Sequence, residues 1–442
     1  MDDWRWMSAA DLGRAIGAGQ IDARALTETF LAAIDAHEHR DRIYARTTPD
    51  RARAEAGAAA DRAASGLRRG PLDGVPVSWK DLFDTAGVAT EAGTALMTGR
   101  VPGRDADVLE NATAAGLICL GKTHLSEIAF SGLGLNPITA TPPCVNDPDA
   151  VPGGSSSGAA ASVAFGLAAA GIGSDTGGSV RIPSAWNDLV GLKTTHGLLS
   201  VKGAVPLCET FDTVGPLCRT TEDAALLLAV LGSTPAPDLS AASLEGTRLA
   251  ILDTVAMEDL RPEPRSAFES AVARLRDAGA QIDHIRIPEL AEAFTFAGPL
   301  YTADSWSWWR DRIEAAPDKM FAQIYERIRV GRDVAAADYI AHWRRLREIR
   351  AIYADATAAF DATISPTAPI LPPQAARLLS DDDYYVSENL LALRNTRVGN
   401  LMGLCGLTLP TGTPSCGLLF NGRAGGEAAL LRLGAAAEAA LS

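Results

Sequence analysis

The spacing of apolar and polar positions changes several times along the chain, between the period of a helix and that of a strand. Apolar residues three to four positions apart predict helices over 23–37, 159–165, 263–278 and 425–441, and a longer helical pattern over 288–360. Short apolar or alternating runs predict strands over 75–79, 116–121, 168–173, 247–252, 281–287, 361–367 and 407–412. Strands that alternate with helices are typical of α/β proteins. We therefore expect an α/β fold, a single large α/β/α sandwich with a mixed central sheet flanked by helices.

Residues that cap helices stand where the first of these patterns begin. Ser8 is followed three residues later by Asp11, and Asp22 directly precedes the first long apolar pattern. Pro49 follows Thr48 and opens a helix rich in alanine and arginine, since proline is well tolerated at the first helical position. These signals predict three helix starts within the N-terminal part of the chain.

One stretch has the composition of a linker, "STPAPDLSAAS" at 233–243. It divides a first half rich in short motifs from a second half that has few, and it is either a domain boundary or a surface loop. No internal repeat is visible. Because large α/β enzymes often exceed the usual length of a domain, we expect one domain over 1–442.

The charge balance limits the partners of this protein. The formal net charge is −14 and the isoelectric point is about 5.0, and no basic stripe is present. The uncharged stretch 158–173 is mostly alanine and glycine, which predicts a buried helix and not a membrane span. The beginning, "MDDWRWMSAADL", lacks the charged and apolar regions of a signal peptide. We expect a cytoplasmic protein that binds neither nucleic acid nor membranes.

The cysteines and histidines form no pattern typical of a metal site. The six cysteines include no CxxC pair, and the six histidines include no HExxH motif. We expect buried free thiols, no metal and no cofactor.

Two clusters of glycine and serine, "GGSSSG" at 153–158 and "SDTGGSVR" at 174–181, lie on either side of an apolar, alanine-rich segment. Glycines beside serines allow backbone N–H groups to converge on an anion and allow unusual conformations at a nucleophile. The residue types alone leave two interpretations, structural turns or a hydrolytic serine site.

A lysine stands at the end of a predicted strand in "GVPVSWKDLFDTAG", residues 74–87. Burial would lower the pKa of Lys80 and make its neutral amine available as a base. The alternative is a structural lysine paired with Asp81 or Asp84.

These motifs together resemble the amidase signature family. The resemblance rests on "GVPVSWKD", "GGSSSG", "GSDTGGSVRIPS" and "GLKTTHGLLS", is strong over about 67–220, and extends weakly to the last helix. Ser155 lies 75 positions after Lys80, and Ser179 lies 24 positions after Ser155, as in that family. "SPTAP" and "LTLPTG" match further family landmarks in the second half.

The resemblance implies a Ser–cis-Ser–Lys triad. Ser179 matches the nucleophile, Ser155 the bridging serine with a cis peptide bond, and Lys80 the base. The family's oxyanion hole consists of backbone N–H groups, which correspond here to those of Thr176, Gly177, Gly178 and Ser179.

Three neighbouring residues correspond to supporting positions. Ser174 and Asp175 are expected to brace the loop by hydrogen bonding. Arg181 either binds a substrate carboxylate or forms an ion pair with Asp175, and the ion pair is favoured. His196 stands where the family usually has an aromatic residue, and it is not expected to act as a base.

The resemblance implies hydrolysis of a small-molecule amide to a carboxylate and ammonia or an amine, through an acyl-enzyme on Ser179 and without a cofactor. The alternative is the catalytic subunit of a glutamine-dependent amidotransferase, a glutaminase that supplies ammonia to a partner enzyme acting on aminoacyl-tRNA. Gly426 stands where that branch has an acidic residue, which favours the stand-alone amidase. A homodimer remains open.

The resemblance also indicates where the substrate pocket lies. The variable helical region of the family, about 290–345 here, lines the acyl pocket. Trp306 and Trp309 lie three positions apart within it and either shape the pocket or belong to the core.

Overall fold

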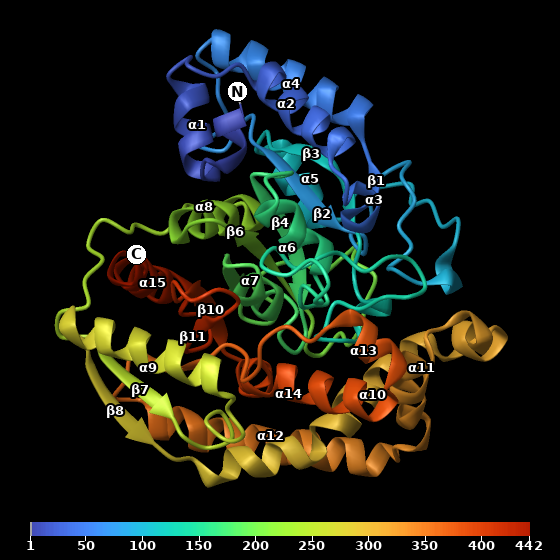
Figure 1. Ribbon diagram of the computed structural model, residues 1–442, viewed down its shortest axis with the longest axis vertical. Coiled ribbons are helices and arrows are strands. Elements are labelled where there is room, and N and C mark those ends of the chain that lie inside the picture. The colour runs from blue at the N-terminus through green and yellow to red at the C-terminus, as the bar shows by residue number, and fades with distance from the viewer. Residues whose placement is uncertain (1) are drawn as a thin grey trace.

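The computed structural model describes residues 2–442, and its strands form one sheet of eleven in the order β1-β3-β2-β4-β6-β5-β10-β11-β9-β7-β8 (Figure 1). Two groups of parallel strands, β3-β2-β4 and β9-β7-β8, are joined by an antiparallel centre. The sheet is therefore mixed, and the predicted fold class is confirmed. The strands are β1 (Tyr44–Thr47), β2 (Pro76–Lys80), β3 (Ile118–Thr123), β4 (Ala170–Asp175), β5 (Val190–Lys193), β6 (Thr213–Cys218), β7 (Arg248–Leu252), β8 (Gln281–Ile285), β9 (Ala362–Pro366), β10 (Cys405–Pro410) and β11 (Gly417–Gly422).

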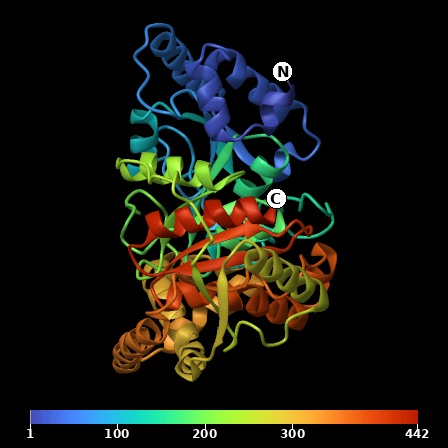
Figure 2. The same cartoon turned by 90° about the vertical axis from the view of Figure 1, so that its left-hand side faces the viewer.

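Helices cover both faces of this sheet. On one face α8, α15 and α9 lie side by side, toward the viewer in Figure 2, and on the other α6 and α7 pack on the strands with α14 behind α7. The helices are α1 (Ala9–Gly17), α2 (Ala23–Ala36), α3 (Arg40–Ile43), α4 (Pro49–Ala64), α5 (Asp107–Ala114), α6 (Ser157–Ala164), α7 (Arg181–Trp186), α8 (Thr221–Gly232), α9 (Pro262–Asp277), α10 (Pro288–Ala315), α11 (Ala322–Arg329), α12 (Ala336–Thr357), α13 (Ala375–Ser380), α14 (Asp382–Leu401) and α15 (Glu427–Leu441).

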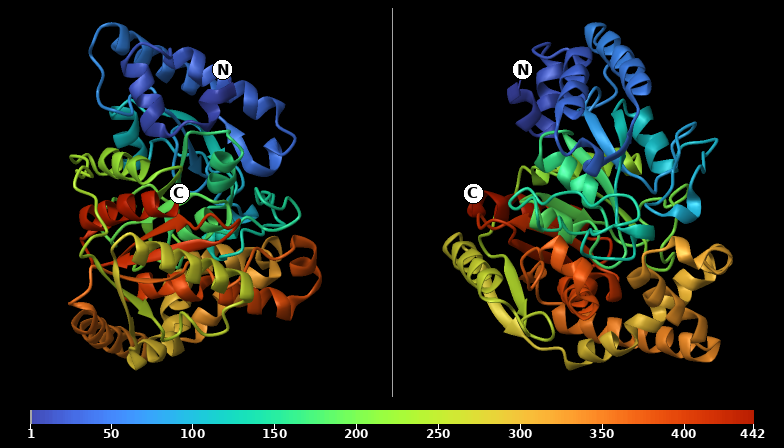
Figure 3. Two further views of the ribbon diagram at one scale, coloured as in Figure 1. Left: turned by 60° about the vertical axis from the view of Figure 1, so that its left-hand side comes forward. Right: turned by 45° about the vertical axis from the view of Figure 1, so that its right-hand side comes forward.

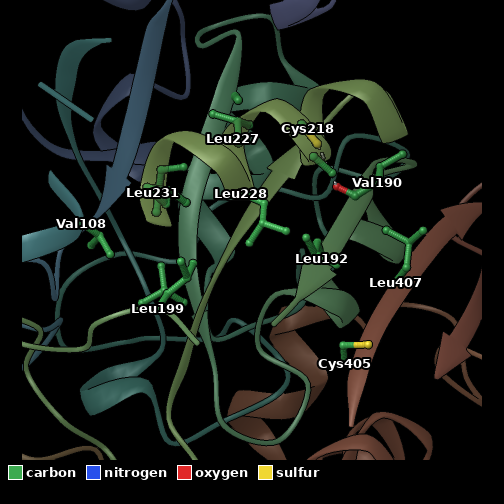
Figure 4. Packing of buried hydrophobic residues seen from close by; sticks show 14 of the residues in the cluster. Val108, Val190, Leu192, Leu199, Cys218, Leu227, Leu228, Leu231, Cys405 and Leu407 are labelled. Carbon is green, nitrogen blue, oxygen red and sulfur yellow. Dashed lines mark hydrogen bonds between the residues drawn. The ribbon is translucent and has the colours of Figure 1, made fainter. Parts of the chain in front are cut away.

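The core between α8 and the sheet shows how apolar periodicity fixes these layers. Leu227, Leu228 and Leu231 of α8 are buried and pack over Val190 and Leu192 of β5 (Figure 4). Burying one such leucine stabilises the fold by roughly 1.5–3 kcal/mol before entropy is counted.

The two halves of the sequence share this sheet. The linker-like stretch 233–243 is a loop between α8 and β7. Because β5 of the first half pairs with β10 of the second, the loop does not separate two sheets.

The helical pattern predicted over 288–360 is confirmed, and it consists of three helices. It is broken into α10, α11 and α12, because Pro317 begins a short 3-10 turn after α10 and a second such turn, Val330–Asp333, follows α11. Figure 3 shows these helices at the end of the molecule opposite the N-terminal helices. Within residues 2–442, no helix combines the length and the apolar character that crossing a bilayer requires.

Candidate active site

Lys80 is the last residue of β2 and points into the interior, where its side chain is fully buried. Its Nζ donates to Ser155 Oγ at 2.7 Å and to Ser174 Oγ at 2.8 Å. Burial lowers the pKa of Lys80 to about 7, although the charges of Asp212 and Asp175 raise it in part. A large fraction of Lys80 is therefore neutral near pH 7, as a general base requires.

The structural interpretation of Lys80 as a partner of Asp81 or Asp84 is wrong. Asp81 accepts from Lys122 Nζ at 3.1 Å and is paired with an arginine of β1, whereas Asp84 is paired with Arg100 at 2.6 Å. Both carboxylates have other positive partners, and Lys80 instead donates hydrogen bonds to Ser155 and Ser174.

The first glycine–serine cluster holds Ser155 against the sheet. The peptide bond between Gly154 and Ser155 is cis. Gly154 donates its N–H to the Gly132 carbonyl at 2.8 Å, and a Cβ on Gly154 would lie 2.6 Å from the nitrogen of Gly134. Such a distance excludes any side chain, so glycine is required by the close approach of two backbone segments.

The second cluster folds around the carboxylate of Asp175. Its oxygens accept from the N–H groups of Gly178 at 2.9 Å and Val180 at 3.1 Å, and from Arg181 Nη2 at 2.8 Å. Burial alone would raise the pKa of Asp175, but the ion pair with Arg181 keeps it below its ordinary value. Arg181 is thus committed to Asp175, as the favoured interpretation of the sequence has it.

The two clusters are joined directly. Ser156 donates its N–H to the Ser179 carbonyl at 3.1 Å, and Ser156 Oγ donates to the Ser174 carbonyl at 3.2 Å. The loop that carries Ser155 and the loop that carries Ser179 therefore form one rigid unit beside Lys80.

One of the four expected oxyanion donors needs correction. The N–H group of Gly178 is directed at Asp175, because its φ of 138° turns the peptide inward. The N–H groups of Thr176, Gly177 and Ser179 have no acceptor within residues 2–442. These three remain as donors to a substrate oxygen.

Ser179 opens onto a cavity that is partly open to solvent. The lining comes from the loop of Ser179, from 129–131 and Leu207 of the first half, and from α10, α11 and α14 of the second half. The lining consists of Ala129, Phe130, Ser131, Thr176, Gly177, Ser179, Leu207, Tyr301, Arg327, Leu393 and Arg397. Two of these, Tyr301 and Arg327, come from the region 290–345.

Other residues singled out in the sequence lie outside this cavity. Trp309 is fully buried and donates its Nε1 to the Pro206 carbonyl at 2.9 Å, and Trp306 packs against the core. His196 is exposed and contacts the carbonyl of Glu209 at 2.8 Å. Gly426 is the residue before α15 and is absent from the lining.

Sequence reasoning missed three charged residues of the site. Asp212 accepts from Thr176 Oγ1 at 2.5 Å and raises the pKa of Lys80, and its own pKa is raised to about 6 by burial. Arg327 and Arg397 line the cavity from α11 and α14. None stands in a glycine-rich motif, so only the folded chain brings them to Ser179.

Comparisons with known proteins agree with this arrangement. The profile of the family described as Amidase matches residues 25–431. The chain is 34% identical to 2-amino-5-chloromuconic acid deaminase of Comamonas testosteroni, with 98% of this chain and 97% of that protein covered. It is also 34% identical to a glutamyl-tRNA(Gln) amidotransferase subunit of Chloroflexus aurantiacus, with 95% and 93% covered. The solved peptide amidase of Stenotrophomonas maltophilia superposes with a TM-score of 0.83 at 27% identity, covering 98% of this chain and 96% of that one.

The protein is an enzyme of the α/β class that hydrolyses amide bonds. The chain belongs to the Amidase family, as the resemblance in its motifs predicts.

Proposed function

We propose that Ser179 is the nucleophile of amide hydrolysis and that Ser155 and Lys80 form its proton relay. The observation that carries this proposal is the buried Lys80, whose pKa is lowered to about 7 and whose Nζ lies 2.7 Å from Ser155 Oγ. A serine hydroxyl attacks an amide only when a base takes its proton.

In the proposed reaction the Ser179 hydroxyl passes its proton to Ser155, which passes its own to neutral Lys80. Ser179 Oγ forms a bond to the amide carbonyl carbon, and the resulting oxyanion accepts hydrogen bonds from Thr176, Gly177 and Ser179. One such donor lowers the barrier by roughly 3–4 kcal/mol. The relay returns the proton to the leaving nitrogen as the C–N bond breaks. Water then hydrolyses the ester by the same route and releases the carboxylate.

A second candidate is a transamidating subunit that takes ammonia from glutamine, because one relative at 34% identity carries that name. The cavity argues against glutamine. Its lining contains Arg327 and Arg397 and no acidic residue, so the α-ammonium group of glutamine would lie near like charges without a carboxylate partner. We propose a stand-alone amidase with one domain over 1–442 and a small-molecule amide as substrate.

The test of the nucleophile uses matched serines. Ser179→Ala and Ser155→Ala are expected to lose amide hydrolysis, and Ser179→Ala is expected to lose labelling by a fluorophosphonate probe. Ser157→Ala is the control, since Ser157 begins α6 and its Oγ donates to the His124 carbonyl. The control should keep most of its activity. Unchanged labelling of Ser179→Ala would remove Ser179 from the mechanism.

The test of the reaction class is ammonia release by the purified chain without tRNA or a partner. A simple primary amide should be hydrolysed under these conditions, and glutamine should be a poor substrate. If glutamine is preferred and a second subunit is needed, the transamidating function is the correct one.

A further inference from the structure

Two arginines in the wall of the cavity have no carboxylate partner. Arg327 and Arg397 form no ion pair within residues 2–442. The other arginine buried close to Ser179, Arg181, is paired with Asp175 at 2.8 Å. Arg327 and Arg397 thus lack the carboxylate partner that Arg181 has.

The protein holds both guanidinium groups by few contacts, none of them with a carboxylate. Arg327 Nη1 donates to the Phe130 carbonyl at 2.8 Å, and its guanidinium lies 4.1 Å from the centre of the Phe130 ring. The guanidinium of Arg397 lies 5.8 Å from the centre of the Tyr301 ring. Cation–π contacts orient these groups but leave most of their N–H donors available.

Both side chains stay charged in this environment. Burial lowers the pKa of Arg327 to about 10, helped by the charge of Arg397, and burial also lowers the pKa of Arg397. A guanidinium remains protonated at neutral pH even so. Two positive charges therefore face one small space with no negative charge in its lining.

A partly buried charge without a counter-ion is unfavourable, and an anionic ligand removes that cost by supplying the missing partner. Guanidinium groups bind planar carboxylates through paired N–H donors. The same cavity contains Ser179, Thr176 and Gly177, so an anion held by the arginines would lie beside the proposed reacting centre.

We propose that Arg397 and Arg327 bind a carboxylate carried by the amide substrate, so that the enzyme prefers small amides of dicarboxylic acids to neutral amides. This inference rests on the proposed amidase function and names its substrate class.

The test compares two amides of the same shape. Succinamate carries a carboxylate where 4-methylpentanamide carries an isopropyl group. We expect kcat/KM of the wild-type enzyme for succinamate to exceed that for 4-methylpentanamide by about 100-fold. Arg397→Met should remove this preference, mainly by raising KM for succinamate.

A matched control separates charge recognition from packing. Arg350 of α12 is also largely buried, donates to the Leu401 carbonyl at 2.7 Å and lies over the ring of Trp343, but it is absent from the cavity lining. Arg350→Met should keep the preference for succinamate. Arg397→Lys keeps the positive charge but lacks the paired N–H donors of a guanidinium group. Its ratio of kcat/KM for succinamate to kcat/KM for 4-methylpentanamide should be about a tenth of the wild-type ratio.

Binding to Ser179→Ala keeps this test independent of the proposed mechanism. Calorimetry should detect succinamate but not 4-methylpentanamide binding to this variant, and Arg397→Met in the same background should abolish the binding. That result supports the carboxylate site even if hydrolysis proceeds by another nucleophile. Equal binding of both amides, or an unchanged preference in Arg397→Met, overturns the proposal.

Discussion

At the scale of single residues, the protonation of Lys80 decides whether the proposed relay works. Only the neutral amine accepts a proton, and burial lowers the pKa of Lys80 to about 7. The neutral fraction grows as the pH rises, so kcat/KM should increase through an apparent pKa near 7 and then level off. Rates measured from pH 5 to 9 test this expectation.

The matched substitution is Lys80→Arg, which keeps the positive charge but cannot give it up. Its activity should fall by several orders of magnitude and show no rise near pH 7. A Lys80→Arg enzyme with near-normal rates and the wild-type profile would mean that Lys80 is structural.

Asp212 is predicted to tune this base without touching the substrate. The charge of Asp212 raises the pKa of Lys80, so Asp212→Asn should lower that pKa and move the rise in kcat/KM to lower pH. The same series of rates from pH 5 to 9 measures this shift. Asp84→Asn serves as the control, because Asp84 is paired with Arg100 and should leave the midpoint unchanged. The same midpoint in Asp212→Asn and the wild type would contradict this role.

The sequence predicts some of these residues and not others for a physical reason. Lys80, Ser155 and Ser179 stand in local patterns, because Ser155 and Ser179 directly follow glycines and Lys80 ends an apolar strand. Arg327 and Arg397 stand in ordinary amphipathic helices, where an arginine at the surface and an arginine at a cavity look alike. Their position depends on tertiary packing.

At the scale of elements, the loop from β4 to α7 is the most constrained part of the site. Gly178 has a φ of 138°, and a Cβ there would lie 2.1 Å from Thr396 Oγ1. Gly178→Ala should lower the free energy of unfolding by about 2 kcal/mol or more and strongly reduce activity.

Gly177→Ala is the matched control one residue earlier. Its Cβ would meet Leu393 at an ordinary contact distance of 3.6 Å. The change in unfolding free energy, measured in urea, should stay within about 0.5 kcal/mol. Equal losses of unfolding free energy in the two variants would contradict this prediction. They would mean that the positive φ and the close contact of Gly178 are not the cause of the destabilisation.

The pattern of apolar positions did not predict the helix α14 or the strands β5 and β6. The helix α14 is absent from the predictions because its buried face carries polar residues, including Glu388, Asn389, Asn395 and Asn400. Apolar periodicity cannot indicate a face of that kind. The strands β5 and β6 were also missed, because they are short and contain glycine or proline. The strands of the predicted α/β pattern, by contrast, are apolar or alternating runs that the structure reproduces within a few residues.

At the scale of the whole molecule, α14 connects the second half of the chain to the loops of the first. The hydrogen bonds of its polar face include those from Gly132 N to Asn389 Oδ1 at 2.9 Å, from Thr396 Oγ1 to the Gly177 carbonyl at 2.8 Å, and from Arg181 Nη2 to Asn400 Oδ1 at 2.6 Å. Together with the pairing of β5 and β10, these bonds make the proposed site a product of both halves.

We therefore predict that the two halves unfold together. Far-UV circular dichroism and tryptophan fluorescence should give one coincident transition in urea. Asn389→Ala sharpens the test, because it leaves the Gly132 N–H and the Ser131 hydroxyl without their acceptor and should lower the unfolding free energy by about 1–3 kcal/mol. Hydrogen exchange pulses at each urea concentration should show peptides from 67–220 and from 248–442 shifting to lower urea by the same amount. If only the peptides of 248–442 shift, the halves fold independently and the single domain is refuted.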